Sequence, residues 1–158
     1  MGIVARMLPH VVDGSASPME TALIMLLCLP GRLGGFGLPK PEVNRPLPLP
    51  DEARLASGHA HCVPDLLWPE QRVAVEYDGA DYHSSEGQVT RDLRRRNILA
   101  TLGLSVIVVR KEQVQDYLEF EHLARSIARL LGARVRPRVA NWGERHEELR
   151  REALGRHF

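Results

Sequence analysis

The stretch Pro64-Asp65-Leu66-Leu67-Trp68, followed by Val73-Ala74-Val75-Glu76-Tyr77-Asp78-Gly79, decides the fold of this chain. It predicts two strands, over His59–Leu67 and Arg72–Asp78, joined by a tight turn at Trp68–Gln71. Side chains alternate along a strand, so Val73, Val75 and Tyr77 share one face, and Ala74, Glu76 and Asp78 share the other. The two carboxylates therefore point the same way, and Asp65 on the neighbouring strand can face them.

An acidic cluster of this kind needs a compensating positive charge. Burying carboxylates in a half-apolar hairpin is costly unless a cation or a hydrogen-bond donor lies beside them. Carboxylate oxygens are the ligands that hard divalent cations prefer. The hairpin therefore predicts a divalent metal ion close to the cluster.

The pattern Pro64-Asp65, an apolar strand ending in Glu76-Tyr77-Asp78-Gly79, and the nearby His83 resembles the PD-(D/E)XK nuclease superfamily. It most resembles the branch of very short patch repair endonuclease-like proteins, over roughly Ser17 to Gly132. This resemblance implies an α/β protein with a restriction-endonuclease-like core, in which the element order is αβββαβ and helices flank a mixed sheet. Asp78 stands where the superfamily pattern has lysine, and members of this branch often carry an acidic residue there.

The resemblance implies a Mg²⁺- or Mn²⁺-dependent endonuclease that hydrolyses DNA phosphodiester bonds. Asp65 and Glu76 would hold the metal, together with the backbone carbonyl of Tyr77. Metal ions held by carboxylates activate water and neutralise charge at the phosphate. The implied catalytic residues are Asp65, Glu76, Asp78, His83 and Glu20.

Each of these residues also has a structural interpretation. Asp65 could cap a turn, Glu76 could form an ion pair, and Asp78-Gly79 is an ordinary turn dipeptide. His83 could be a solvated histidine, and it could equally act as a general acid or base. Glu20 belongs to a capping box that opens a helix at Ser17-Pro18.

A helix is predicted over Glu86–Leu102, and Arg91, Arg94 and Arg95 span one turn of it. These arginines could bind DNA phosphates beside the metal, or form a solvated face with local pairing to Asp92. Aromatic residues make up 5% of the chain, so a platform for stacking single-stranded bases is not expected.

The other elements follow from apolar periodicity and from glycine and proline. They are an apolar helix over Ser17–Cys28, a short edge strand near Glu42–Leu47, a turn or short helix over Asp51–Gly58, a central buried strand over Leu104–Val109, an amphipathic helix over Tyr117–Leu131, and a charged, weakly docked helix over Glu144–Leu154. These elements predict an N-terminal extension over residues 1–14, a nuclease-like domain over 15–132, and a basic linker with a C-terminal helix over 133–158.

Composition limits the remaining classes of function. The chain has 158 residues, is 44% hydrophobic and carries a net charge of +1, so any nucleic-acid surface must be local. The apolar run Thr21–Leu29 is too short to span a bilayer, and the two cysteines suggest a reducing compartment. We therefore expect a cytoplasmic protein with no membrane partner.

Several alternatives remain open. His59, His61, Cys62 and His83 are zinc-ligand types, although their spacing forms no closed four-ligand set. The chain could be a non-catalytic DNA-binding or regulatory module, such as the C-terminal domain of an abortive-infection antitoxin-like protein. It could also be a structural domain of a larger assembly, or a fragment of a longer protein. Many related nucleases pair to cut both strands, so a homodimer is a further option.

Overall fold

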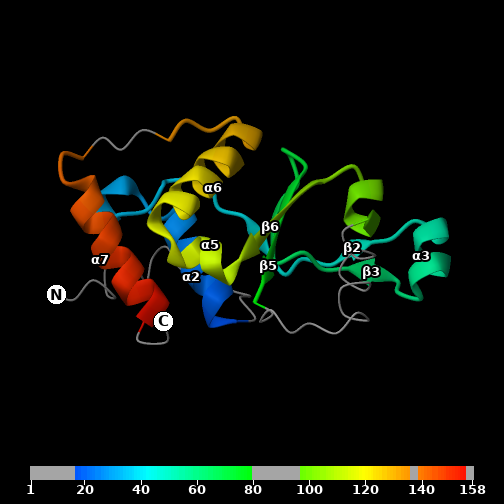
Figure 1. The fold of residues 1–158 in the computed structure, drawn as a ribbon. Helices are drawn as coiled ribbons and strands as arrows, with labels where there is room; N and C mark the ends of the chain where they lie inside the picture. Colours follow the sequence, from blue (N-terminus) through cyan, green and yellow to red (C-terminus); the bar gives the residue numbers. More distant parts are fainter. Residues whose placement is uncertain (1–16, 80–96, 136–138, 156–158) are drawn as a thin grey trace. The chain divides into compact units, whose positions relative to one another are not determined.

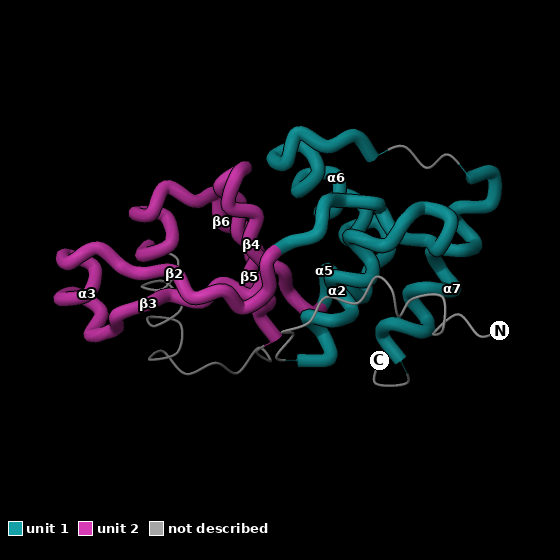
Figure 2. Tube along the Cα trace, turned by 180° about the vertical axis from the view of Figure 1, so that it is seen from behind, with its two compact units in different colours: residues 1–41, 112–158 teal, residues 42–111 magenta. Residues whose placement is uncertain are grey.

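The computed structural model describes residues 17–79, 97–135 and 139–155 (Figure 1). The fold is mixed α/β and contains a mixed sheet, as the sequence predicts. The chain divides into two compact units, of which unit 1 comprises residues 1–41 and 112–158 and unit 2 comprises residues 42–111 (Figure 2). No helix among the described residues combines the length and the apolar character needed to cross a membrane.

Unit 2 contains a four-stranded sheet in the order β1-β4-β5-β6. Its strands are β1 (Glu42–Val43), β4 (Leu66–Trp68), β5 (Val73–Asp78) and β6 (Ser105–Arg110). The first two pairings are antiparallel and β5 pairs with β6 in parallel. A parallel pair needs a crossover connection, and the helical residues 97–101 lie within it. The antiparallel pairing of the predicted hairpin and the mixed character of the sheet are therefore both confirmed.

The turn between β4 and β5 is fixed to the end of the helical residues 97–101. Arg72 adopts a positive φ of 55°, and its guanidinium donates to the carbonyls of Leu102 at 2.8 Å and Gly103 at 3.1 Å. Its own carbonyl accepts from the amide of Ser105 at 2.8 Å. Gly103 has a φ of 73°, so the predicted glycine stop of this helix is confirmed.

The prediction that the apolar strand after Gly103 is central and buried is wrong for the described part of the sheet. There β6 pairs with β5 alone and is the outermost strand, with Ser105 and Arg110 exposed. A continuous apolar run has the same appearance whether a strand is central or is an edge strand covered on its faces. The run itself therefore could not place β6 in the sheet.

The predicted strand over His59–Leu67 is divided in two. Its first part, β3 (His61–Cys62), pairs with β2 (Leu47–Pro48) in a separate two-stranded sheet, and α3 (Asp51–Ser57) connects these strands. Pro64 interrupts the run because it has no amide to donate to a ladder. The buried side chains of Leu49, Cys62 and Leu99 then form a small core of their own.

Unit 1 is built on helix α2 (Pro18–Cys28), which begins as predicted. The Ser17 hydroxyl accepts from the amide of Glu20 at 3.2 Å, and Pro18 occupies the first helical position. The buried side chains cover most of its circumference, which confirms the prediction of a buried helix. They are Glu20, Ala22, Leu23, Ile24, Leu26 and Leu27.

The carbonyl end of α2 is satisfied by the chain that follows it. After the short 3-10 helix η2 (Gly31–Leu33), the segment 36–38 turns back along the helix. Its amides donate to α2 carbonyls or to Leu29 at distances of 2.9–3.0 Å. The last carbonyls of a helix have no partner within it, so this returning segment takes the place of a side-chain cap.

The C-terminal helix α7 (Trp142–Leu154) is part of the core of unit 1, which corrects the expectation of weak docking. The ring of His146 stacks on Trp142 with centroids 4.7 Å apart, and Phe36 packs edge-on at 5.1 Å. Trp142 Nε1 donates to the carbonyl of Gly35 at 3.1 Å. Most charged side chains of α7 are exposed. Trp142 and His146 instead pack against the glycine-rich loop of residues 31–37.

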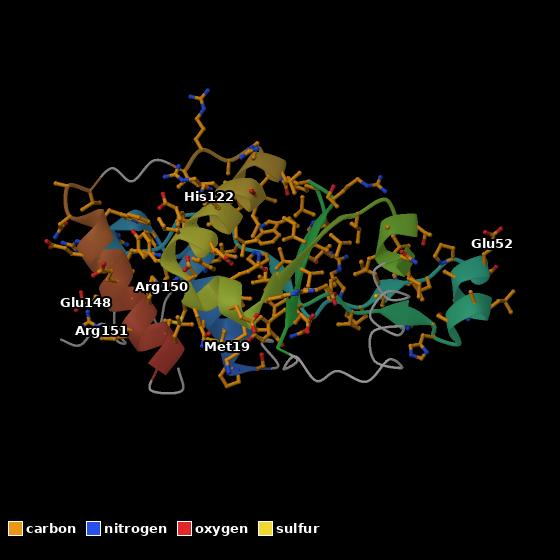
Figure 3. All side chains as sticks on the ribbon, viewed as in Figure 1. Met19, Glu52, His122, Glu148, Arg150 and Arg151 are labelled. Atoms are coloured by element: carbon orange, nitrogen blue, oxygen red, sulfur yellow. The ribbon has the colours of Figure 1, made fainter. Side chains whose placement is uncertain are left out.

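Helix α7 also closes the end of helix α5 (Lys111–Gln115). Arg150 is 8% exposed, and its guanidinium donates to the carbonyls of Val114 at 2.7 Å and Gln115 at 2.8 Å (Figure 3). It also lies over the ring of Phe120 on helix α6 (Tyr117–Leu130), at 5.5 Å from the centroid. A buried arginine therefore joins three helices of unit 1.

The buried His146 predicts a pH-dependent stability. Its ring is 1% exposed, and Nδ1 lies 2.7 Å from the Gly34 carbonyl, which can only accept, so Nδ1 carries the proton. Burial lowers the pKa of His146, and the nearby Arg150 lowers it further, against the opposing effect of the Gly34 hydrogen bond. The unfolded chain thus binds a proton at a higher pH than the folded chain does.

We therefore expect the free energy of unfolding to fall as the pH decreases below about 6.5, by up to about 1.4 kcal/mol per pH unit. Urea unfolding between pH 7.5 and pH 5.5 measures this slope in the wild type and in His146→Phe, which should lose this component. His122→Phe, at an exposed position of α6, is the matched control and should keep it. Equal slopes in the two variants would contradict the assignment.

Candidate functional site

The pairing of β4 with β5 brings Asp65 close to the end of β5. Leu66 pairs with Val75 and Leu67 pairs with Ala74, and Asp65 comes directly before this ladder. Asp65 therefore lies beside the segment of β5 that carries Glu76 and Tyr77.

Asp65 is held in place by the neighbouring strand. The amide of Tyr77 donates to Asp65 Oδ2 at 2.7 Å, and the amide of Asn44 donates to the Asp65 carbonyl at 3.0 Å. The first of these bonds involves an ionised acceptor and is correspondingly short. The Asp65 side chain, just beyond the end of β4, therefore accepts a hydrogen bond from the Tyr77 amide. This bond fixes the direction of the carboxylate.

Asp78 lies on the same face as Glu76, two residues further along β5. The parallel pairing sets Asp78 opposite Arg110, the last residue of β6, and Glu76 opposite Val108. Glu76 and Asp78 are half-buried, whereas Arg110 is exposed. One end of this face therefore carries the carboxylates of Glu76 and Asp78 and the guanidinium of Arg110, next to apolar side chains.

The sequence interpretation missed Arg110. Arg110 directly follows the predicted strand Leu104–Val109 and is not among the predicted site residues. The signal that could have found it is the register, because aligning two parallel strands by their polar ends places Arg110 beside Asp78.

Comparisons with known proteins add distant relatives. No family model and no solved structure matches the chain. The chain is 30% identical over 134 residues to the uncharacterized protein Rv2248 of Mycobacterium tuberculosis, and equally to MT2308 from a second strain of that organism. Each alignment covers 82% of this chain and 42% of the relative, so the chain spans less than half the length of these proteins.

The donor set at the end of β5 suits a hard cation such as Mg²⁺. This ion is usually held by one or two carboxylates, and water and substrate phosphates supply its other ligands. Asp65 and Glu76 could supply two such carboxylates, and Tyr77 a backbone carbonyl. Within the described ranges no three His, Cys, Asp or Glu side chains are grouped to hold a metal ion.

One other predicted site residue, Glu20, is among the described residues. It belongs to unit 1 and is 7% exposed in the first turn of α2. The predictions for His83, Arg91, Arg94 and Arg95 fall outside the described residues.

The zinc alternative gains no support from the residues that the structure describes. His59 and His61 are exposed, whereas Cys62 is 8% exposed and packs with Leu49 and Leu99. In unit 1, burial raises the pKa of the Cys28 thiol to about 12, so this thiol stays protonated, whereas the thiolate is the form that binds metals. Neither cysteine is therefore placed as a zinc ligand, and Cys62 contributes to a hydrophobic core.

An apolar hollow of about 410 Å³ in unit 2 is separate from the acidic residues. Its lining residues are Leu47, Pro48, Leu67, Pro69, Glu70, Arg72, Leu102 and Leu104. None of the predicted site residues that the structure describes is among these lining residues.

Proposed function

We propose that this protein is a metal-dependent endonuclease that hydrolyses DNA phosphodiester bonds. The observation that carries the proposal is the position of Asp65 beside the end of β5 that carries Glu76, where the Tyr77 amide donates to the Asp65 carboxylate at 2.7 Å. The sheet supports it, because an antiparallel run of β1, β4 and β5 followed by a parallel β6 is the order expected of a restriction-endonuclease-like core.

The roles of the residues follow from their placement. Asp65, Glu76 and the Tyr77 carbonyl would hold Mg²⁺ or Mn²⁺. When bound, such an ion lowers the pKa of a coordinated water and offsets the phosphate charge. The Tyr77 amide keeps Asp65 directed toward β5, and Asp78 adds negative charge that can hold a water molecule or a second donor. The half-buried position of Glu76 and Asp78 strengthens these electrostatic effects.

The test is nicking of supercoiled plasmid by the purified chain with Mg²⁺, Mn²⁺ or EDTA. Glu76→Gln keeps the size of the side chain and removes its charge, so we expect a loss of cleavage by a factor of about 1,000, or several kcal/mol. The matched control is Glu70→Gln, an exposed glutamate in the turn between β4 and β5, which should cut as the wild type does.

Equal cleavage by Glu76→Gln and wild type, or cleavage that persists in EDTA, would refute this mechanism. A folded wild-type protein that binds DNA but leaves the plasmid intact with both metals would favour the non-catalytic DNA-binding or regulatory module.

A further inference from the structure

We propose that Arg110 is the phosphate-binding residue of the acidic face and that it also offsets the charge of Asp78. This inference rests on the proposed function and assigns a role to a residue outside the metal-binding set. Arg110 ends β6 at the position opposite Asp78, and its side chain is exposed.

The electrostatics of the face call for a cation at this place. Glu76 and Asp78 lie on one face of β5, and Asp65 lies beside it, where its Oδ2 accepts from the Tyr77 amide at 2.7 Å. An approaching phosphodiester carries negative charge and is repelled by such a cluster. A guanidinium beside it reduces the repulsion and presents a planar fork of donors that matches both carboxylate and phosphate oxygens.

The geometry supplies that fork from the adjacent strand. Partners in a parallel pair project from the same face of the sheet, so the Arg110 side chain leaves the sheet where Asp78 does. Two residues before Arg110 on β6, Val108 pairs with Glu76. Arg110 is therefore the polar end of a strand whose preceding residues are apolar. It can therefore reach a phosphate bound at the end of the sheet.

A simple surface ion pair is the competing explanation. Exposed ion pairs contribute about 0–1 kcal/mol to stability. If Arg110 only forms such a pair, removing it should change the cation affinity and the DNA affinity no more than removing another exposed arginine does. The two explanations therefore predict different responses to the loss of the arginine charge.

The experiment compares Arg110→Ala, Arg110→Lys and the control Arg54→Ala, which removes the same charge from an exposed position of α3 in unit 2. Mn²⁺ binding is measured by calorimetry without DNA, and binding of a short fluorescent DNA duplex is measured by anisotropy in EDTA. We expect Arg110→Ala to bind Mn²⁺ about fivefold more tightly and the duplex about tenfold more weakly than Arg54→Ala does. Arg110→Lys should restore the Mn²⁺ affinity and only part of the duplex affinity.

The outcomes separate this inference from the proposed function. If wild type cuts plasmid but Arg110→Ala matches Arg54→Ala within twofold in both measurements, Arg110 has no such role and the nuclease proposal stands. If wild type does not cut but the two affinities change in opposite directions as expected, the nuclease proposal fails and the assignment of Arg110 stands. A wild type that binds neither Mn²⁺ nor the duplex overturns both.

Discussion

Gly35→Ala is expected to lower the free energy of unfolding by about 3 kcal/mol or more, because the added methyl group has no room. A Cβ atom at this position would lie 2.0 Å from the Leu29 carbonyl oxygen and 2.6 Å from its carbon. Both are backbone atoms, and the Leu29 oxygen also accepts from the Gly37 amide at 2.9 Å. Relieving the overlap would separate the loop from the end of α2 and disturb the Trp142 hydrogen bond to the Gly35 carbonyl.

The matched control is Gly37→Ala, in the same loop. Gly37 has a φ of 70°, but a Cβ atom there would meet nothing within 4 Å. Its cost should be only that of the left-handed conformation, about 1 kcal/mol. Chemical unfolding followed by circular dichroism measures both variants. Similar losses in the two would mean that conformation, and not the close approach of Leu29, dictates glycine in this loop.

Asp65 is expected to show two separable effects, on cleavage and on stability. Asp65→Ala removes a proposed metal ligand and also the acceptor of the Tyr77 amide. We therefore expect a loss of cleavage of about 1,000-fold and of about 1–3 kcal/mol in unfolding free energy. Asp65→Asn keeps an oxygen that can accept from Tyr77 but carries no charge. It should lose cleavage as the alanine variant does, while retaining most of the stability.

Plasmid nicking and urea unfolding of the same preparations test this expectation. Asp51→Asn serves as the control, because Asp51 is an exposed aspartate at the start of α3 in the same unit. Strong cleavage by Asp65→Asn would remove Asp65 from the metal site. Equal stability of Asp65→Ala and Asp65→Asn would show that the Tyr77 bond contributes nothing to the fold.

Local signals predicted those parts of the fold that short segments of sequence determine. Ser17 and Pro18 fix the start of α2, and Gly103 fixes the end of the crossover helix. The alternation along β5 predicted which side chains share a face, and the pairing of β4 with β5 then brought Asp65 beside the end of β5. These features depend on residues close together in the chain or on one hairpin.

The features that the sequence could not place depend on contacts between distant segments. The edge position of β6 is decided by which strand lies beside it, and no property of its own apolar run records that choice. The burial of His146 depends on the carbonyl of Gly34 and on the aromatic ring of Phe36, both far away in the sequence. Charge along Glu144–Leu154 indicated a solvated helix, and the predicted range began after Trp142, the residue whose ring docks the helix.

The order of segments in unit 1 has a consequence for synthesis. Helix α2 precedes unit 2 in the chain, and α7, which packs with it in the folded state, follows unit 2. A ribosome must therefore make all of unit 2 before it makes the helix that completes the surroundings of α2. Throughout that interval the nascent chain carries an apolar helical segment without its native partner, the kind of surface that chaperones bind during translation.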